Sequence, residues 1–216
     1  DADYSQIELR LLAHISGDET MKKAFSCGED FHTVTASNVF GVPLSEVTPT
    51  LRSRAKAVNF GIVYGISAFS LAQDIGVPQS EAKAYMEAYL EKYHGVREYM
   101  KTVVEKAKAD GYVATLYGRR RELPELKSTN FNTRSFGERV ALNMPIQGTA
   151  ADIMKLAMVA VHHRLAAEGL RSRLILQVHD ELIAECPMDE AERVRAILTE
   201  EMENAAHLSV PLTVEA

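Results

Sequence analysis

The sequence has few cysteines and no long apolar run, and these two absences exclude several classes of protein. Among its 216 residues only Cys27 and Cys186 are cysteines, and their wide separation fits neither a zinc site nor a disulfide framework. This usage is typical of a reducing compartment, so we expect a cytoplasmic protein. No apolar stretch of about 18 residues is present to span a membrane, and we expect no membrane association.

The chain also lacks an initiator methionine, a signal peptide, internal repeats and low-complexity tracts. Because it opens directly on DADYSQIELR, we expect an excised fragment of a longer protein. No Ser/Gly linker separates domains, so any division of the chain must arise by insertion of one part into another. The apolar content of 46% is sufficient for a hydrophobic core without a structural metal or disulfides.

An excess of positive charge is missing as well. The chain carries 24 Lys and Arg against 30 Asp and Glu, a net charge of −6, so its composition gives no indication of a nucleic-acid partner. The distribution is uneven, since residues 92–139 carry a net charge of +5 and residues 180–216 a net charge of −8. One interpretation is a basic surface for a polyanion beside an acidic patch for cations. Solvated helix faces are the commoner origin of such runs.

Hydrophobic periodicity and turn residues predict a mostly helical α+β fold with a few antiparallel strands. Helices are expected at 4–16, 50–65, 80–110 with a break near Gly95, from Pro145 to Gly169, and at 188–206. Hairpins are expected at 112–124 and 173–187, and a short strand in the final VPLTVEA. Tyr85, Tyr89 and Tyr93 recur every four residues, a row that favours core packing over a platform for stacking bases.

Three acidic residues are the first candidates for chemistry. Asp180 and Glu181 interrupt the apolar hairpin at 173–187, and Asp3 lies in a second short extended segment. The hairpin flanks are expected to be buried: Leu176, Val178, Leu182 and Ile183. Acidic hairpin tips are often simply exposed, but carboxylates on neighbouring strands can share a pair of Mg²⁺ ions, which assist phosphoryl transfer.

The helix at 50–65 provides a complementary pattern. Arg52, Lys56, Phe60 and Tyr64 recur every four residues and therefore lie along one slowly drifting stripe. Two cations followed by two aromatic rings could bind a triphosphate at one end and a base at the other. An ordinary amphipathic helix with one wet end is the alternative. Gly61 and Gly65 leave a surface bare enough for a close approach, which is unusual for packing alone.

Three segments together resemble a known family. DYSQIELR at 3–10, RxxxKxxxFGxxYG at 52–65 and VHDE at 178–181 are similar, in order and spacing, to the three polymerase motifs of family A DNA polymerases, the bacterial DNA polymerase I family. The resemblance runs through the whole chain, including GRR at 118–120 and NMPIQGTAAD at 143–152. It implies a DNA-directed DNA polymerase that acts in DNA replication and repair. Such an enzyme adds deoxynucleotides to a primer 3′-OH by phosphoryl transfer assisted by two Mg²⁺ ions.

The resemblance also assigns roles to residues. The metal ligands it implies are Asp3, Asp180 and the backbone carbonyl of Tyr4. Glu181 would be a supporting acid, and Lys56 would protonate the departing pyrophosphate. The residues implied to surround the incoming deoxynucleoside triphosphate are Gln6, Glu8, His32, Arg52, Lys56, Phe60 and Tyr64. Among them Glu8 resembles the steric gate against a ribose 2′-OH. The residues implied to contact primer-template DNA are Arg139, Asn143, Gln147 and His179.

The same resemblance predicts the domain organisation. Residues 1–20 and 139–216 would form a palm, an antiparallel sheet backed by helices, and residues 21–138 an inserted, all-helical fingers subdomain. The thumb and any nuclease domain would lie outside this chain, which we expect to be a monomer with weak or no activity alone. Two alternatives are metal-dependent phosphodiester hydrolysis and a degenerate nucleic-acid-binding scaffold. A nuclease has no need of the cation and aromatic stripe, and a degenerate scaffold would be expected to lose Asp3, Lys56 and Asp180.

Overall fold

The structure, a computed structural model, describes all 216 residues. The strands are β1 (Ala2–Tyr4), β2 (Tyr112–Ala114), β3 (Arg120–Glu122), β4 (Arg173–Val178), β5 (Glu181–Glu185) and β6 (Val214–Glu215). The helices are α1 (Ile7–Ser16), α2 (Glu19–Ser26), α3 (Phe31–Phe40), α4 (Pro49–Tyr64), α5 (Ala68–Ile75), α6 (Gln79–Lys92), α7 (His94–Asp110), α8 (Phe131–Ala167) and α9 (Ala191–Glu203), with short 3₁₀ turns at Leu44–Glu46 and Pro124–Lys127. The predicted α+β class is confirmed. The prediction that residues 21–138 are all-helical was wrong, because β2 and β3 pair as an antiparallel hairpin within this range.

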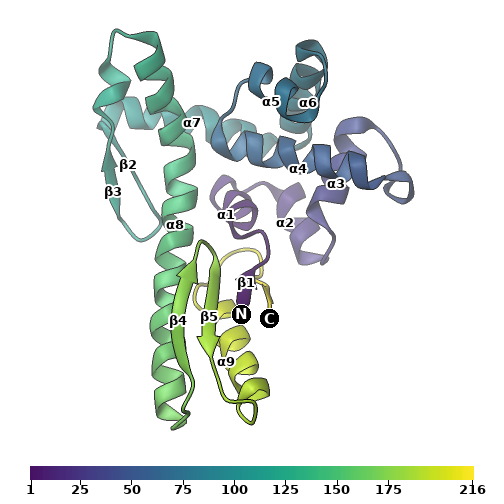
Figure 1. Cartoon of the computed structure of the whole chain (residues 1–216). Helices are drawn as coiled ribbons and strands as arrows, with labels where there is room; N and C mark the ends of the chain where they lie inside the picture. The colour runs from purple at the N-terminus through teal and green to yellow at the C-terminus, as the bar shows by residue number, and fades with distance from the viewer.

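The first and last segments of the chain meet in one antiparallel sheet. Its strand order is β4-β5-β1-β6, so β1 lies between two strands from the end of the chain, and the two termini lie close together (Figure 1). Asp3 is opposite Glu181 on β5 and opposite Glu215 on β6. Helices α8 and α9 lie behind the sheet (Figure 1). Because of this strand pairing, Asp3, Glu181 and Glu215 lie side by side although they are far apart in the sequence.

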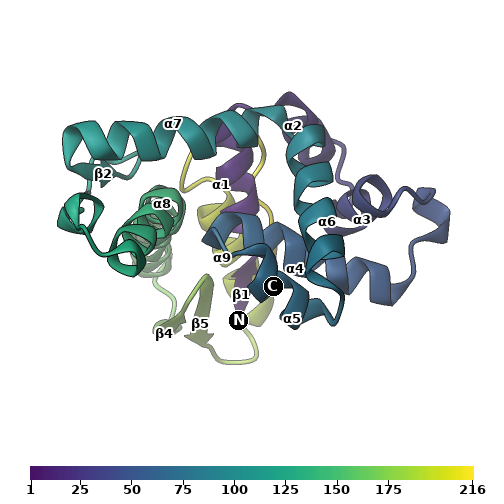
Figure 2. The same cartoon turned by 90° about the horizontal axis from the view of Figure 1, so that it is seen from above.

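Helices α2 to α6 form a lobe beside the sheet, and α7 leads from this lobe to the β2–β3 hairpin (Figure 2). One continuous apolar core links both regions, with members such as Phe31 and Val58 in the lobe and Ile153 and Leu182 near the sheet. Tyr89 and Tyr93 are fully buried in this core, which confirms the prediction that the tyrosine row packs internally. No helix is both long enough and apolar enough to cross a lipid bilayer.

The break predicted near Gly95 falls at Tyr93, between α6 and α7. Gly95 itself lies inside α7, where its backbone N–H donates to the Asp18 carboxylate at 2.8 Å. A Cβ at this position would lie 2.8 Å from the Asp18 Cα atom, so only glycine permits the approach. The same carboxylate accepts a bond from Met21 N at the start of α2, and thus caps one helix while holding another.

The helix predicted to start at Pro145 starts instead at Phe131, so that prediction was wrong. Asn130 caps the helix, because its side chain accepts bonds from the N–H groups of Asn132 and Thr133. Pro145 lies inside α8 and removes only one backbone donor from a helix of 37 residues. The Tyr99 hydroxyl donates to the Leu142 carbonyl at 2.9 Å in the same turn. α8 therefore continues through Pro145, which is buried together with Ile146 in the folded chain.

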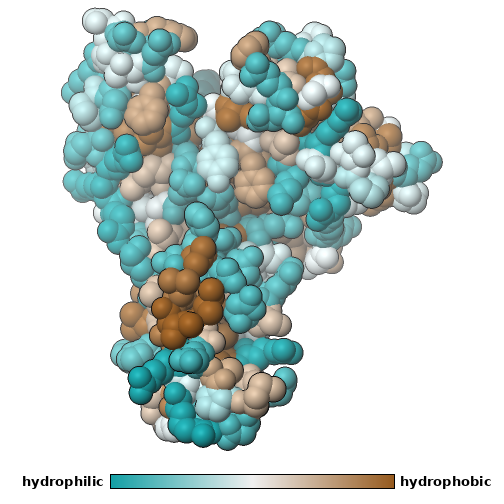
Figure 3. Space-filling view, in the orientation of Figure 1, coloured by the Kyte–Doolittle hydropathy of each residue, from teal (hydrophilic) through white to brown (hydrophobic).

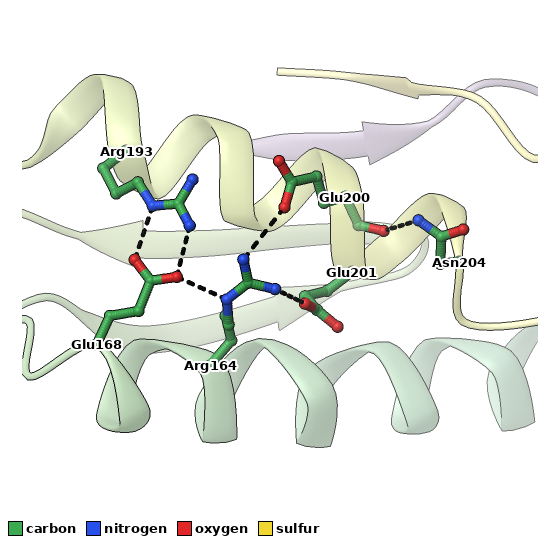
Figure 4. A network of polar contacts seen from close by, with 6 residues as sticks. All are labelled: Arg164, Glu168, Arg193, Glu200, Glu201 and Asn204. Atoms are coloured by element: carbon green, nitrogen blue, oxygen red, sulfur yellow. Dashed lines mark hydrogen bonds and ion pairs between the residues drawn. The ribbon is translucent and has the colours of Figure 1, made fainter.

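Ion pairs join the C-terminal end of α8 to α9 (Figure 4). Glu168 accepts bonds from Arg193 at 2.5 and 2.7 Å and from Arg164 Nε at 2.6 Å. Arg164 also reaches Glu201 at 2.8 Å and Glu200 at 3.5 Å. Because arginine presents several donors in one plane, a single side chain bridges both helices. The network fixes the two helices that support the sheet.

The hairpin flanks are only partly buried, contrary to prediction. Leu182 on β5 is buried and Ile183 is half-buried, but Leu176 and Val178 on β4 are 54% and 38% exposed. β4 is an edge strand that pairs with β5 alone, whereas β5 has a neighbour on each side. Figure 3 shows the resulting apolar patch over β4. Strand propensity predicted the strand itself but not its place at the edge of the sheet.

Candidate active site

Asp3, Asp180 and Glu181 form an acidic centre at the top of the sheet. Asp3 is opposite Glu181, and the Tyr4 N–H donates to the Asp180 carbonyl at 3.1 Å. Partial burial raises the pKa of Asp3, and the negative charges of Asp180, Glu181 and Glu215 raise it further. None of these four carboxylates takes part in an ion pair within the chain. The centre therefore concentrates negative charge that no protein cation balances.

This donor set fits a divalent cation. Two carboxylates and a neighbouring backbone carbonyl are hard oxygen ligands, which Mg²⁺ prefers, and Mg²⁺ usually retains several waters. No group of three or more His, Cys, Asp or Glu side chains is gathered closely enough to enclose an ion. The side chains present would therefore hold an ion only together with water or other oxygen ligands.

Two residues beside the acids adopt a left-handed backbone conformation. Gln6 has a φ of 56° and His179 a φ of 53°, and they are the only non-glycine residues with positive φ. Such conformations cost of order 1 kcal/mol or more and tend to concentrate at functional sites. The Gln177 side chain donates to the His179 carbonyl at 2.6 Å and stabilises the turn that presents Asp180. The Gln6 Oε1 atom is buried without a partner.

The predicted stripe is present on α4. Thr48 caps the helix through the Leu51 N–H, and Pro49 takes its first position. Along the stripe, Lys56 Nζ lies 6.0 Å from the centre of the Phe60 ring. Phe60 is stacked on Tyr64 with 6.2 Å between ring centres and 18° between planes. The helix thus carries cations at its N-terminal half and stacked rings at its C-terminal half.

Arg52 is held by an acidic residue from the preceding helix cap. Its Nε and Nη2 atoms donate to the two Asp30 carboxylate oxygens at 2.5 and 3.2 Å. Burial alone would raise the pKa of Asp30, but hydrogen bonds from Arg52 and Thr33 hold it below its usual value. Asp30 also caps α3 through the His32 N–H. This pair orients the guanidinium in the absence of a ligand.

His32 is buried between α3 and α4. Its ring centre lies 6.0 Å from that of Phe60, and its Nδ1 atom is 3.0 Å from Asn59 Nδ2. Burial lowers the pKa of His32 to about 4, with Asp30 opposing the effect and Arg52 and Lys56 adding to it. The imidazole is therefore neutral at pH 7.

Glu8 and Tyr64 meet between α1 and α4. The Tyr64 hydroxyl donates to Glu8 Oε2 at 3.1 Å. Partial burial raises the pKa of Tyr64, and the Glu8 carboxylate raises it further. The contact joins the segment that carries Asp3 to the end of the stripe on α4.

A cleft of about 790 Å³ connects the acidic centre with the aromatic end of the stripe. Seven of the residues singled out from the sequence line it: Tyr4, Glu8, Phe60, Tyr64, Gln147, His179 and Asp180. The residues outside this lining are Asp3, Glu181, Gln6, His32, Arg52 and Lys56. Asp3 and Glu181 lie beside Asp180 in the sheet, and His32 and Lys56 lie beside the Phe60 ring. Sequence reasoning missed Lys155 and Gln177, which also line the cleft. Lys155 could have been found, because Gln147, Ala151 and Lys155 recur every four residues on α8.

Two further α8 residues singled out from the sequence lie against the end of α4 rather than in the cleft. Asn143 Nδ2 is 3.5 Å from the Val63 carbonyl. A Cβ on Gly65 would lie 3.4 Å from Arg139 Cγ and 3.0 Å from a Leu142 methyl group. Gly65 also has a φ of 63°, so its lack of a side chain serves both the helix end and the close packing.

The fold and the geometry of the site can be compared with known proteins, and this comparison identifies the family. The family model described as DNA polymerase family A matches residues 1–216. The chain belongs to DNA polymerase family A. Membership of this family implies a divalent metal cofactor in general.

The relatives include DNA polymerase I from several bacteria. The chain is 54% identical over 215 residues to DNA polymerase I of Caldicellulosiruptor bescii, covering 100% of this chain and 25% of that protein. It is 55% identical over 214 residues to DNA polymerase I of Bacillus subtilis, covering 99% of this chain and 24% of that protein. The chain therefore spans about a quarter of the length of these relatives.

A solved structure supports the same relation. The POL domain of Pol1 from M. smegmatis, in complex with DNA primer-template and dNTP, matches this fold with a TM-score of 0.95 and 50% sequence identity. The match covers 99% of this chain and 38% of that chain. The fold class and the family resemblance predicted from the sequence are thus confirmed.

Proposed function

We propose that this chain is the palm and fingers region of a template-directed DNA polymerase that acts in DNA replication and repair. The observation that carries the proposal is a single cleft that has an unbalanced acidic centre at one end and a cation and aromatic stripe beside it. The proposed palm comprises residues 1–20 and 139–216, and the proposed fingers residues 21–138. We further propose that the chain is a cytoplasmic monomer.

In the proposed reaction a primer 3′-oxygen attacks the α-phosphorus of a deoxynucleoside triphosphate. A new O–P bond forms, the bond to the β-phosphate oxygen breaks, and pyrophosphate leaves. Two Mg²⁺ ions held by Asp3, Asp180 and the Tyr4 carbonyl would supply charge neutralisation and lower the pKa of the attacking hydroxyl. Glu181 adds negative charge beside this centre and favours cation binding.

The stripe on α4 and its neighbours would bind the triphosphate. Arg52 and Lys56 provide positive charge, and His32 a neutral hydrogen-bond donor, for phosphate oxygens. Lys56 would also protonate the departing pyrophosphate. Phe60 would lie under the sugar and base, and Gln6 near the incoming nucleotide. Glu8, held by the Tyr64 hydroxyl at 3.1 Å, would fill the space that a ribose 2′-OH needs.

The proposed partner is primer-template DNA, as in the M. smegmatis complex. Gln147 and His179 line the cleft and would contact the duplex at the site of reaction. Arg139 and Asn143, at the junction of α8 with α4, would contact it alongside. The basic run at 92–139 would add phosphate contacts that do not depend on sequence.

A polymerase and a nuclease with the same acidic centre can be distinguished by the direction of the length change in a labelled primer. We would replace the corresponding quarter of a nuclease-free B. subtilis DNA polymerase I with these 216 residues, which gives a chimeric polymerase. Incubation with a 5′-labelled primer-template and one deoxynucleoside triphosphate should lengthen the primer by one residue only when the template specifies that base. Shortening of the primer without addition would support the hydrolytic alternative and contradict the proposal.

A further inference from the structure

Three polar side chains are buried together where α3 packs on α4. Thr35 and Asn59 are fully buried, and His32 is 3% exposed. Burying polar groups is costly unless they are hydrogen-bonded to one another. Here the Thr35 hydroxyl donates to Asn59 Oδ1 at 3.1 Å, and Asn59 Nδ2 lies 3.0 Å from His32 Nδ1. The three groups form one continuous chain of hydrogen bonds that ends on the imidazole.

The direction of this chain fixes the proton on the histidine. An amide nitrogen only donates, so His32 Nδ1 must accept the bond from Asn59. A neutral imidazole carries a single N–H, which must then be on Nε2. The Thr35 hydroxyl donates its proton to Asn59 Oδ1 and so keeps the Asn59 amide in this orientation, because a rotated amide would lose that hydrogen bond. Burial keeps the ring neutral at pH 7, with a pKa of about 4.

The Nε2 atom is available to a ligand. It makes no hydrogen bond within the chain, and it is not among the buried polar atoms that lack a partner, so it reaches the surface. The cations beside it are Arg52 and Lys56, whose charges act on the imidazole. Asp30, the nearest acid, is already engaged by the Arg52 guanidinium. An Nε2–H in this setting favours an anionic oxygen as its acceptor.

We propose that Asn59 and Thr35 are positioning residues that hold His32 as its Nε2–H tautomer, so that this N–H donates to a phosphate oxygen of the incoming triphosphate. The proposal rests on the proposed function for the identity of the ligand. The opposite tautomer would turn a lone pair toward the phosphate, which repels it. A neutral donor also adds a hydrogen bond without a third positive charge beside Arg52 and Lys56.

The tautomer can be measured without any polymerase activity. In the 216-residue chain labelled with ¹⁵N-histidine, the His32 signals are assigned by their loss in His32→Gln. At pH 7 we expect a protonated Nε2 and an unprotonated Nδ1. Asn59→Asp presents only acceptors, so the proton should move to Nδ1 or the ring should become doubly protonated. Thr35→Val, which keeps the shape of the side chain, should give a mixture of tautomers, even if Asn59→Asp fails to fold.

A matched control lies on the same helix. Ser37 donates to the Val42 carbonyl and has no hydrogen bond to His32, Thr35 or Asn59, so Ser37→Ala should leave the His32 signals unchanged. A wild-type ring protonated on Nδ1 would overturn the proposal. Unchanged His32 signals in both Asn59→Asp and Thr35→Val would also overturn it.

The ligand is tested separately by titration with dATP and Mg²⁺. Thr35→Val should weaken dATP binding about two- to tenfold, the effect of one impaired hydrogen bond. The same substitution should have no further effect in a His32→Gln background, because Thr35 acts through His32. If His32→Gln leaves dATP affinity unchanged, the triphosphate role of His32 in the proposed function fails. The tautomer signals report on Asn59 and Thr35 independently of that result.

Discussion

At the scale of single residues, the site is defined by charges that the chain leaves unbalanced. Asp3 has its pKa raised by partial burial and by three neighbouring carboxylates, whereas Asp30 has its pKa lowered by Arg52. Asp3 has no cationic partner within the chain, whereas Asp30 is paired with Arg52. Asp30 is therefore engaged by an adjacent side chain, whereas the charge of Asp3 is left free for the proposed cation.

Asp3→Asn should stabilise the metal-free chain at pH 7. A raised folded-state pKa means that the native state binds more protons than the unfolded state, so stability falls as pH rises above 3.8 through the raised pKa. Removing the charge should recover roughly 0.5 kcal/mol after allowance for solvent screening. Thermal unfolding at pH 7 and below pH 3.8 measures this, and the gain should vanish at the lower pH. Asp74→Asn, at an exposed position without an ion pair, is the control, and an equal gain there would contradict the account.

Glu8→Ala should relax selection against ribonucleotides. The side chain is held beside the cleft by Tyr64, and its removal opens the space that a 2′-hydroxyl would occupy. We expect the preference for deoxynucleotides over ribonucleotides to fall at least about tenfold, which corresponds to 1.4 kcal/mol. Single-nucleotide addition by the chimeric polymerase with paired substrates measures the ratio. An unchanged ratio would show that Glu8 only supports the fold.

At the scale of elements, the sequence predicts best where local rules decide the structure. The stripe on α4 follows from its four-residue spacing and from the Thr48 cap, and both are observed. The start of α8 was wrongly placed because Pro145 is a strong local signal that tertiary packing overrides. The exposure of Leu176 and the place of Gln177 in the cleft depend on which strand forms the sheet edge. Strand order is a long-range property that hydrophobic patterning does not contain.

The α8–α9 junction should be sensitive to acid. Hydrogen bonds from Arg193 and Arg164 lower the pKa of Glu168 from 4.5 to about 2. A lowered carboxylate pKa gives stability that is present above 4.5 and lost as pH falls toward about 2. Glu168→Gln should therefore lower the melting temperature at pH 7 and flatten its decline over that acid range.

Glu192→Gln provides the comparison for Glu168→Gln. Glu192 lies on the neighbouring helix α9. Its side chain is 87% exposed, and its distance of 4.0 Å from Arg195 is long for an ion pair. An exposed pair of this kind contributes little to stability, so the pH profile of this variant should match that of the wild type. Equal profiles for the two variants would mean that the network in Figure 4 does not couple the helices.

At the scale of the whole molecule, the site is assembled from the two ends of the chain around an inserted lobe. β1 supplies Asp3, the β4–β5 turn supplies Asp180, and α4 supplies the stripe, while one core connects all three. The three motifs could be recognised in the sequence. The resemblance also predicted that the two ends of the chain share one antiparallel sheet, but the register of β1 with β5 and the cleft itself come from the structure.

The 216-residue chain should bind primer-template DNA more weakly than the chimeric polymerase, with a shallower salt dependence. Each phosphate contact adds about 0.9 to the slope of log affinity against log salt, and the chain alone has a net charge of −6. Fluorescence titration of a labelled duplex at two salt concentrations gives both quantities. Equal affinities and equal slopes would show that the remaining three quarters of the polymerase add no phosphate contacts.

The central claim is that Asp3 and Asp180 are the metal-binding carboxylates of a nucleotidyl-transfer site. The most direct measurement is the single-turnover rate of templated nucleotide addition by the chimeric polymerase and by its Asp180→Asn variant. The amide keeps the shape of the carboxylate but removes the charge that a divalent cation requires. We predict that the rate falls at least about a hundredfold, equivalent to about 2.7 kcal/mol in the barrier, while duplex affinity is retained. Addition at a near-normal rate by Asp180→Asn would contradict the account.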